Sequence, residues 1–384
     1  MSTIKVNAIE STSSGGVAAK IASVNGGPIG VKNLVINGDF RIAQRATSST
    51  DPNYATVDRF LNGRNGLDEA PTQAQHVLTS SDTPYAEGFR FSYHITNGNQ
   101  TSAGADDALT ILHAIEAQDI ASSGWNYTSS SSYVTLQFWV KSSVAQNFYF
   151  LLRNTHGTPQ RYAMETGTLS ANTWTKITKT ISGNSNLVFA NSSVRGLVIE
   201  WSMFRGTNKT NNSVSLNAWS AMDATASTPD FTSTWYTTND ATFEITGVQL
   251  EVGDVATEFE RRSFGQEFAL CQRYCQVITM QNGDYAGFIG IAQGGSDAAV
   301  MKTFPVSFRD EPTYTGSATS MRMQAGNVSN TVNFNALSVY RVPTQRPVAT
   351  IGLRDSNIGS MTAGQVLLLM AMANNGKMIF DAEI

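Results

Sequence analysis

Apolar and polar residues alternate with period two along most of this chain, a pattern that is typical of β-strands with one buried face. The clearest runs lie at residues 89–95, 134–140, 148–152 and 197–201. Clusters of Ser, Asn, Gly and Thr separate them, as at residues 128–132. Many short strands with turn-rich spacers predict an antiparallel sandwich or jelly roll over residues 33–262. The run at residues 108–121 mixes strand and helix periods, so its state stays open.

The stretch from residue 242 to residue 252 changes the parity of this alternation. Phe243 and Ile245 share one face of a strand, but after Gly247 the apolar positions become Val248 and Leu250. A slip of one residue turns every following side chain to the opposite face. We therefore predict a β-bulge at Gly247, because glycine is the residue that bulges favour.

A helix is predicted after this strand. Ser263 precedes Gln266 by three residues, which is the spacing of a capping box. Four apolar residues then share one helical face, namely Phe264, Phe268, Cys271 and Cys275. Two cysteines four residues apart on one helix are poorly placed for a disulfide, so we expect buried free thiols. Residues 263–283 are assigned to this linking helix.

Strand-like patterning returns over residues 284–384 and predicts a small C-terminal β-sandwich. Candidate strands lie at residues 285–291, 300–308, 338–342 and 348–353. Residues 366–373 and 377–384 flank the turn sequence Asn-Asn-Gly, and this arrangement predicts a terminal β-hairpin. The predicted class of the whole chain is therefore all-β, with one linking α-helix.

The first 32 residues are rich in Gly, Ser and Ala and cannot build a core of their own. Two interpretations stay open for them. They are either a flexible tail or an attachment arm that orders against neighbouring chains or a larger assembly.

The composition excludes several classes of protein. With 41% hydrophobic residues the chain does not resemble a disordered protein, and 384 residues suffice for two domains. A net charge of −4 argues against nucleic acid as a partner. No apolar run approaches the length of a membrane span, and the N-terminus lacks a signal-peptide core. We expect a protein that is made in the cytoplasm and leaves it, if at all, by lysis.

Candidate catalytic chemistry is sparse. His76, His94, His113 and His156 are scattered, and none has a histidine partner four residues away. We interpret all four as surface or packing residues and expect no metal site, no cofactor and no catalytic residue. Glycoside hydrolysis needs only two carboxylates, so acids that lie close together in the sequence stay as an alternative: Asp106, Asp107, Glu116 and Asp119.

The tryptophans carry the strongest binding signal, because all six lie between residues 125 and 235. Trp139 stands opposite the apolar parity of its strand, and two others lie in polar, loop-like sequence. Aromatic faces flanked by amide and charged groups suit stacking on sugar rings. We predict glycan-binding residues on this basis: Trp139, Gln137, Lys141, Trp219 and Trp235. Packing of these rings under loops or in a subunit interface is the alternative.

Three segments resemble a known family. They are NLVINGDFRIAQR with VDRF (33–45 and 57–60), ILHAIEAQDIAS with VTLQFWVKSS (111–122 and 134–143), and FEITGVQLEVGDVATEFERRSFGQEFALCQRYCQ (243–276). Together they are similar to the carbohydrate-binding-module-like jelly-roll domain of bacteriophage tail fibres and other virion appendages. The block GQVLLLMAMANNGKMIFDAEI resembles the small sandwich that often follows this domain.

The resemblance implies a homotrimeric structural protein of the virion that presents host-binding surfaces. Carbohydrate-binding jelly rolls often carry an acidic calcium ligand just after an Asn-Gly-x-Phe turn, where this chain has Arg41. A structural calcium ion is therefore not expected, although Asp39 lies close by.

Three functions follow as hypotheses. The first is a phage virion protein, docked to other virion proteins through residues 1–32, that holds a host surface glycan by weak multivalent contacts. The second is a capsid or tail decoration protein without a ligand. The third is a glycan depolymerase that uses carboxylates such as Asp106 and Glu116. It ranks last because elongated depolymerases usually show repeats at a fixed period, and this sequence shows none.

Overall fold

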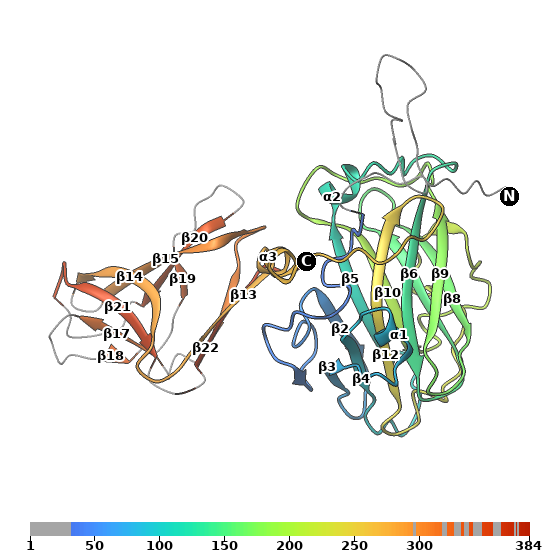
Figure 1. Cartoon of the computed structure of the whole chain (residues 1–384), viewed down its shortest axis with the longest axis horizontal. Coiled ribbons are helices and arrows are strands. Elements are labelled where there is room, and N and C mark those ends of the chain that lie inside the picture. Colours follow the sequence, from blue (N-terminus) through green and yellow to red (C-terminus); the bar gives the residue numbers. More distant parts are fainter. Residues whose placement is uncertain are drawn as a thin grey trace, which may run out of the picture.

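The computed structural model describes residues 32–294, 297–316, 321–325, 332–333, 338–340, 348–355, 362–371, 374 and 376–384. These residues form a larger and a smaller lobe that meet at a waist beside helix α3 (Phe264–Gln272) (Figure 1). Both lobes are built from antiparallel sheets, so the predicted all-β class is confirmed. The predicted attachment arm, apart from Lys32, lies outside the described residues.

The larger lobe consists of two six-stranded sheets. The first sheet has the order β1 (Ser48–Ser49), β3 (Thr72–Val77), β4 (Phe91–Thr96), β12 (Thr242–Val252), β6 (Tyr133–Ser142) and β9 (Thr175–Ser182). The second has the order β11 (Trp219–Ala221), β8 (Gln160–Thr168), β7 (Asn147–Asn154), β10 (Arg195–Arg205), β5 (Ala108–Glu116) and β2 (Phe60–Asn65). The chain crosses between the sheets after β1, β2, β4, β5, β6, β8, β9 and β11, and such repeated crossings are typical of a jelly roll.

The core of the larger lobe lies between the two sheets. Phe138 of β6 meets Trp201 of β10 edge to face, with ring centroids 5.6 Å apart. The predicted inward positions of β6 are all fully buried: Val134, Leu136, Phe138 and Val140. The alternation in the sequence thus identified the apolar face of this strand correctly.

The ambiguous run at residues 108–121 divides into strand β5 and the short helix α2 (Ala117–Ala121). Strand β5 is buried on both faces, because Ile111 and Ile115 face the sandwich while Ala114 packs against Tyr274 from the smaller lobe. A strand that is covered on both sides has apolar residues on both faces. The sequence of β5 therefore shows no alternation with period two.

The predicted β-bulge in β12 is confirmed. The register with β6 shifts between Thr246 and Gln249, and Gly247 adopts a φ of 65°. A side chain at Gly247 would press on the Phe89 ring as well as strain the backbone. The shift keeps the apolar residues on both sides of the bulge buried: Phe243, Ile245, Val248 and Leu250.

Helix α3 begins with the predicted capping box, in which Ser263 and Gln266 satisfy each other's backbone N–H groups. The predicted apolar stripe is wrong, however, because the helix ends at Gln272 and Cys275 starts a strand. Phe264 is 61% exposed and stacks on Phe268 at 5.9 Å. Cys271 and Cys275 are free and buried as expected, and burial raises the pKa of both thiols well above the ordinary value.

The smaller lobe contains two sheets around a mixed apolar core that includes Phe288, Phe304 and Phe380, as the predicted C-terminal sandwich requires. One has the order β13 (Cys275–Met280), β22 (Gly376–Asp381) and β16 (Thr313–Gly316). The other has the order β18 (Val332–Asn333), β17 (Met321–Ala325), β21 (Val366–Ala371), β14 (Tyr285–Gly294), β15 (Asp297–Phe308), β20 (Val348–Asp355) and β19 (Ser338–Tyr340). Strand β13 falls in the segment that was assigned to the linking helix.

The predicted terminal hairpin is wrong. Strand β21 pairs with β14 and β17, whereas β22 pairs with β13 and β16 in the other sheet. The two strands therefore lie in different layers and share the same core, which includes Leu369 and Phe380. A short turn between two apolar strands does not by itself distinguish a hairpin from a crossing between sheets.

Buried charges connect the lobes at the waist, where the C-terminus lies between them (Figure 1). Glu116 at the end of β5 has no exposed surface and accepts hydrogen bonds from Arg273 at 2.8 and 2.9 Å and from the Tyr274 hydroxyl at 2.7 Å. Arg59 stacks on the Tyr274 ring and pairs with Glu383. Breaking one partner of such a buried pair leaves an uncompensated charge, so these contacts fix how the lobes meet.

Acid should destabilise the contact between the lobes, because it protonates Glu116. Burial alone would raise the pKa of this carboxyl, but hydrogen bonds from Arg273 and Tyr274 hold it below the ordinary value of 4.5. A depressed pKa contributes stability that is present above pH 4.5 and is lost as the pH falls further. We expect Glu116→Gln to lower the free energy of unfolding by about 2 kcal/mol at pH 7. In urea titrations the variant should also lose less stability than the native protein between pH 5 and pH 3, and parallel losses would contradict this.

Candidate functional site

A row of polar side chains crosses the outer face of the first sheet. It comprises His76 on β3, His94 on β4, Glu244 on β12 and Lys141 on β6, four strands that are neighbours in the sheet. In the strand register His94 lies opposite Glu244, and Glu244 lies opposite Lys141. Because Phe243 and Ile245 point into the core, Glu244 between them has to point outward.

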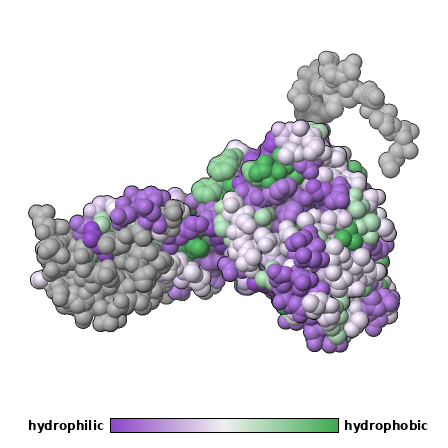
Figure 2. Space-filling model, turned by 90° about the horizontal axis from the view of Figure 1, so that it is seen from below, coloured by the Kyte–Doolittle hydropathy of each residue, from purple (hydrophilic) through white to green (hydrophobic). Residues whose placement is uncertain are grey.

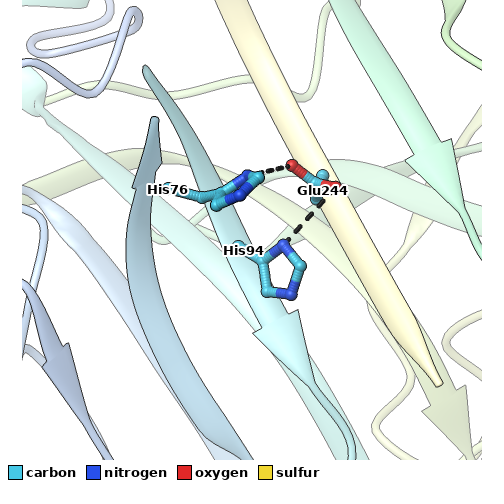
Figure 3. Close-up of side chains that lie close together, drawn as sticks. All are labelled: His76, His94 and Glu244. Carbon is cyan, nitrogen blue, oxygen red and sulfur yellow. Dashed lines mark hydrogen bonds and ion pairs between the residues drawn. The ribbon is translucent and has the colours of Figure 1, made fainter. Parts of the chain in front are cut away.

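Glu244 is the centre of this row and receives four contacts, of which Figure 3 shows those of His76 and His94. One carboxylate oxygen, Oε2, accepts a hydrogen bond from Ser92 Oγ at 2.7 Å and lies 3.1 Å from His76 Nδ1. The other, Oε1, lies 2.8 Å from Lys141 Nζ and 3.4 Å from His94 Nδ1. We call these five residues the Glu244 cluster.

The cluster keeps Glu244 ionised although the residue is only 2% exposed. Burial by itself would raise the pKa of the carboxyl. The hydrogen bonds and charges of His94 and Lys141 outweigh burial and hold the pKa of Glu244 well below its ordinary value. Glu244 is therefore ionised at neutral pH, where it is paired with Lys141.

Two indole rings lie next to this cluster. The Trp139 N–H donates to Glu87 at 3.1 Å, and Lys176 Nζ lies 5.5 Å from the centre of the Trp139 ring. The Trp174 N–H donates to Asp82 at 2.8 Å, and Lys141 Nζ lies 4.8 Å from the centre of the Trp174 ring. Trp174 is buried, whereas Trp139 is partly exposed, and Lys176 and Glu87 form an ion pair at 3.1 Å with exposed side chains.

We call Trp139, Lys176 and Glu87 the Trp139 surface. It lies beside the Glu244 cluster, because Trp139 and Lys141 are two residues apart on β6 and so share the outer face. Lys141 also contacts Asp82 at 3.3 Å. Asp82 and Glu87 both come from the segment between β3 and β4, which contains helix α1 (Thr83–Ala86). This segment folds over the sheet and packs through Leu78 and Phe89, so it holds both carboxylates against the indole N–H groups.

Only part of the predicted glycan site is found on this surface. Trp139 and Lys141 lie there, but Gln137 is 3% exposed and donates to the Thr257 carbonyl beneath the covering segment after β12. Gln137 was therefore predicted wrongly as a surface contact. Trp235 was also predicted wrongly, because its ring is fully buried in the core and its N–H donates to the Thr242 carbonyl.

Trp219 lies on a different part of the lobe. It belongs to β11 at the edge of the second sheet, packs edge to face on Tyr162 and donates its N–H to the Ser182 carbonyl. Ser182 lies six residues along β9 from Lys176, which corresponds to roughly 20 Å at the usual rise of a strand. Trp139 and Trp219 therefore cannot belong to one compact site.

The structure brings two of the four histidines together with Glu244. His76, His94 and Glu244 bring their ligand atoms within 4.8 Å of one another, so these residues could hold a metal ion. They were missed because they come from three strands that are far apart in the sequence and meet only through strand pairing. Their shared outward parity was the one available signal. His113, by contrast, is buried, and burial lowers the pKa of its ring well below the ordinary value.

Asp106 and Glu116, the two carboxylates named for a depolymerase, do not form a pair. Asp106 precedes β5 and Glu116 ends it, which separates them by roughly 30 Å. Glycoside hydrolysis requires carboxyl groups about 5–9.5 Å apart, and Glu116 is buried against Arg273. Asp106 and Glu116 therefore cannot act together as one catalytic pair. Asp39, the acid that lies near the position of a calcium ligand in carbohydrate-binding jelly rolls, forms an ion pair with Arg41.

No family model and no curated protein matches this sequence. None of the helices in the described part of the chain has the length and apolar character needed to cross a bilayer. Several solved structures show a distant likeness to the chain.

One of these structures is the enzymatically active domain of bacteriophage CBA120 tailspike protein 4, with 10% identity and a TM-score of 0.29, over 57% of this chain and 21% of that one. Another is the N-terminal cellulose-binding domain of Cellulomonas fimi β-1,4-glucanase C, with 9% identity and a TM-score of 0.26, over 56% and 99%. A third is the family 11 carbohydrate-binding module from Clostridium thermocellum, with 9% identity and a TM-score of 0.26, over 55% and 98%. At such low identities and TM-scores, these likenesses carry no argument about a ligand.

The different burial of two tryptophans can be tested directly. Trp235→Ala should lower the free energy of unfolding by about 3–5 kcal/mol, because it opens a cavity in the core. Trp139→Ala removes a partly exposed ring and should cost about 1 kcal/mol. Urea denaturation followed by tryptophan fluorescence measures both values. A larger loss for Trp139→Ala would contradict the assignment.

Proposed function

We propose that this protein is a structural component of a bacteriophage virion, a tail fibre or similar appendage, whose larger lobe presents a glycan-binding surface. The observation that carries the proposal is the Trp139 surface, a partly exposed indole beside the exposed Lys176–Glu87 ion pair. An indole offers an apolar face to the CH groups of a sugar ring. The ammonium and carboxylate groups beside it can bind the ring hydroxyls.

The sheet preorganises this surface. Trp139 and Lys176 lie opposite each other on the adjacent strands β6 and β9. Glu87, in the segment that covers the sheet, accepts a hydrogen bond from the indole N–H and so fixes the orientation of the ring. A bound sugar therefore has few side chains to order, which lowers the entropic cost of binding. The surface is small and open, so we expect weak binding at each site. Several copies on one particle supply avidity.

The proposed assembly is a homotrimer that is docked to other virion proteins through residues 1–32. Helix α3 supports self-association because it leaves Phe264 and Phe268 stacked at the waist, with Phe264 61% exposed. An open depression of about 810 Å³ lies beside this helix, lined in part by Leu270 and Val306. The face shown in Figure 2 carries its apolar residues mainly as small separate patches among hydrophilic and neutral ones.

A purely structural role without a ligand is the second candidate. It is favoured by the packing of Trp139 against a small apolar cluster on the outer face, formed by Leu78, Phe89 and Trp174. In that case the ring stabilises the covering segment between β3 and β4. We propose in both cases that the protein holds rather than cleaves its partners.

A glycan array that displays host surface polysaccharides, probed with the full-length protein in the presence of EDTA, tests glycan binding. We expect weak binding that falls at least tenfold in Trp139→Ala and in Lys176→Ala. Trp219→Ala is the matched control, because it removes a partly exposed tryptophan from the other sheet. Absence of binding by the native protein would leave the purely structural role. Binding that is unchanged in Trp139→Ala would show that the glycan is bound elsewhere and would overturn the Trp139 surface as the site.

Light scattering coupled to size-exclusion chromatography tests the assembly. We expect a particle of three 41.4 kDa chains. Phe264→Ser should shift the mass toward the single chain, because it removes an exposed apolar ring from α3. Val188→Ser, at another exposed apolar position, should leave the mass unchanged. A native protein that runs as a single chain would refute the trimer.

A further inference from the structure

We propose that the Glu244 cluster binds a divalent transition-metal ion of the zinc class, held by Nδ1 of His76, Nδ1 of His94 and the carboxylate of Glu244. Two imidazoles and one carboxylate are a ligand set that Zn²⁺ accepts, with a fourth position left for water or another donor. The three residues come from adjacent strands of one sheet, so their backbone positions are fixed before any ion arrives.

The distances between the donor atoms suit a small ion. In a tetrahedral zinc site with bonds near 2.0–2.1 Å, ligand atoms lie about 3.3 Å from one another. His76 Nδ1 and His94 Nδ1 lie 3.1 and 3.4 Å from the two oxygens of Glu244. All the donor atoms lie within 4.8 Å of one another, so small side-chain rotations would complete the site.

The environment of His94 provides an independent reason to expect a cation. Its Nε2 lies 3.0 Å from the Thr96 hydroxyl, and its buried Nδ1 makes no hydrogen bond of normal geometry. The contact with Thr96 holds the ring so that Nδ1 points at Glu244 Oε1, 3.4 Å away. A metal ion bound between these two atoms would give the buried nitrogen the partner that it lacks.

Neighbouring groups orient the ligands in the way that metal sites use. Thr96 fixes the ring of His94, and Ser92 donates to Glu244 Oε2 at 2.7 Å. Partners of this kind set the orientation and basicity of the ligands. The His76 side chain is 48% exposed, so the ion would be open to solvent on one side. A water molecule or a donor from a partner can approach from that direction.

Lys141 disfavours metal binding, because its positively charged ammonium group lies 2.8 Å from Glu244 Oε1 and repels a cation at the same carboxylate. Each carboxylate oxygen has two lone-pair positions, so Lys141 can keep its hydrogen bond while the metal uses the remaining ones. Asp82, at 3.3 Å from Lys141, provides a second partner for the ammonium group. Lys141 therefore weakens metal binding without preventing it, and its removal should tighten the site.

Isothermal titration of the EDTA-dialysed full-length protein with ZnCl₂ at pH 7.4 tests this proposal. We expect one tight ion per chain. His76→Ala and His94→Ala should each weaken binding at least tenfold, since even outer partners of ligands change affinity by about 10–100-fold. Thr96→Val should weaken binding about tenfold, because it removes the group that orients His94 while all three ligands stay. Lys141→Gln should bind more tightly than the native protein.

His156→Ala is the matched control, because His156 lies outside the cluster, and it should bind zinc like the native protein. Near-UV circular dichroism verifies that each variant is folded. Replacement by Co²⁺ should give the intense visible absorption of a tetrahedral site in the native protein but not in His76→Ala, a variant at a half-exposed position. Absence of a tight ion, or equal affinity in His76→Ala and His156→Ala, would overturn the proposal. The glycan array is probed in EDTA, which removes the metal ion. Glycan binding at the Trp139 surface and metal binding at the Glu244 cluster are therefore tested separately.

Discussion

The apolar contact between the two sheets of the larger lobe is the constraint on which the surface depends. Each strand must direct alternate side chains into that contact, so burial of Phe243 and Ile245 fixes the direction of Glu244 between them. The bulge at Gly247 restores burial in the second half of the same strand. The positions of the outward residues thus follow from the packing of the inward ones.

Two of the buried carboxylates, Glu244 and Glu116, each have several partners. Glu244 is surrounded by donors on the outer face, and Glu116 is held by Arg273 and Tyr274 at the waist. Buried ion pairs contribute little net stability compared with apolar packing, but they penalise every arrangement in which a partner is missing. We infer that the waist contacts specify how the lobes meet more than they stabilise either lobe.

Local features of the structure could be predicted from the sequence, whereas those that depend on strand pairing could not. The alternation in β6, the bulge at Gly247 and the capping box at Ser263 each involve residues close together in the chain. The terminal hairpin and the burial of Trp235 depend on which distant strand lies next to each segment. For the same reason, His76, His94 and Glu244 looked unrelated, although the register places them together.

Three of the four sheet edges in the larger lobe are short or carry lysines. The first sheet ends at β1, which has two residues, and the second at β11, which has three. Strand β9 forms the opposite edge of the first sheet and carries Lys176 and Lys179. Unpaired edges invite strand addition between molecules, and brevity or lysine charge discourages it. Such edges allow many copies to be packed at high local density without merging their sheets into aggregates.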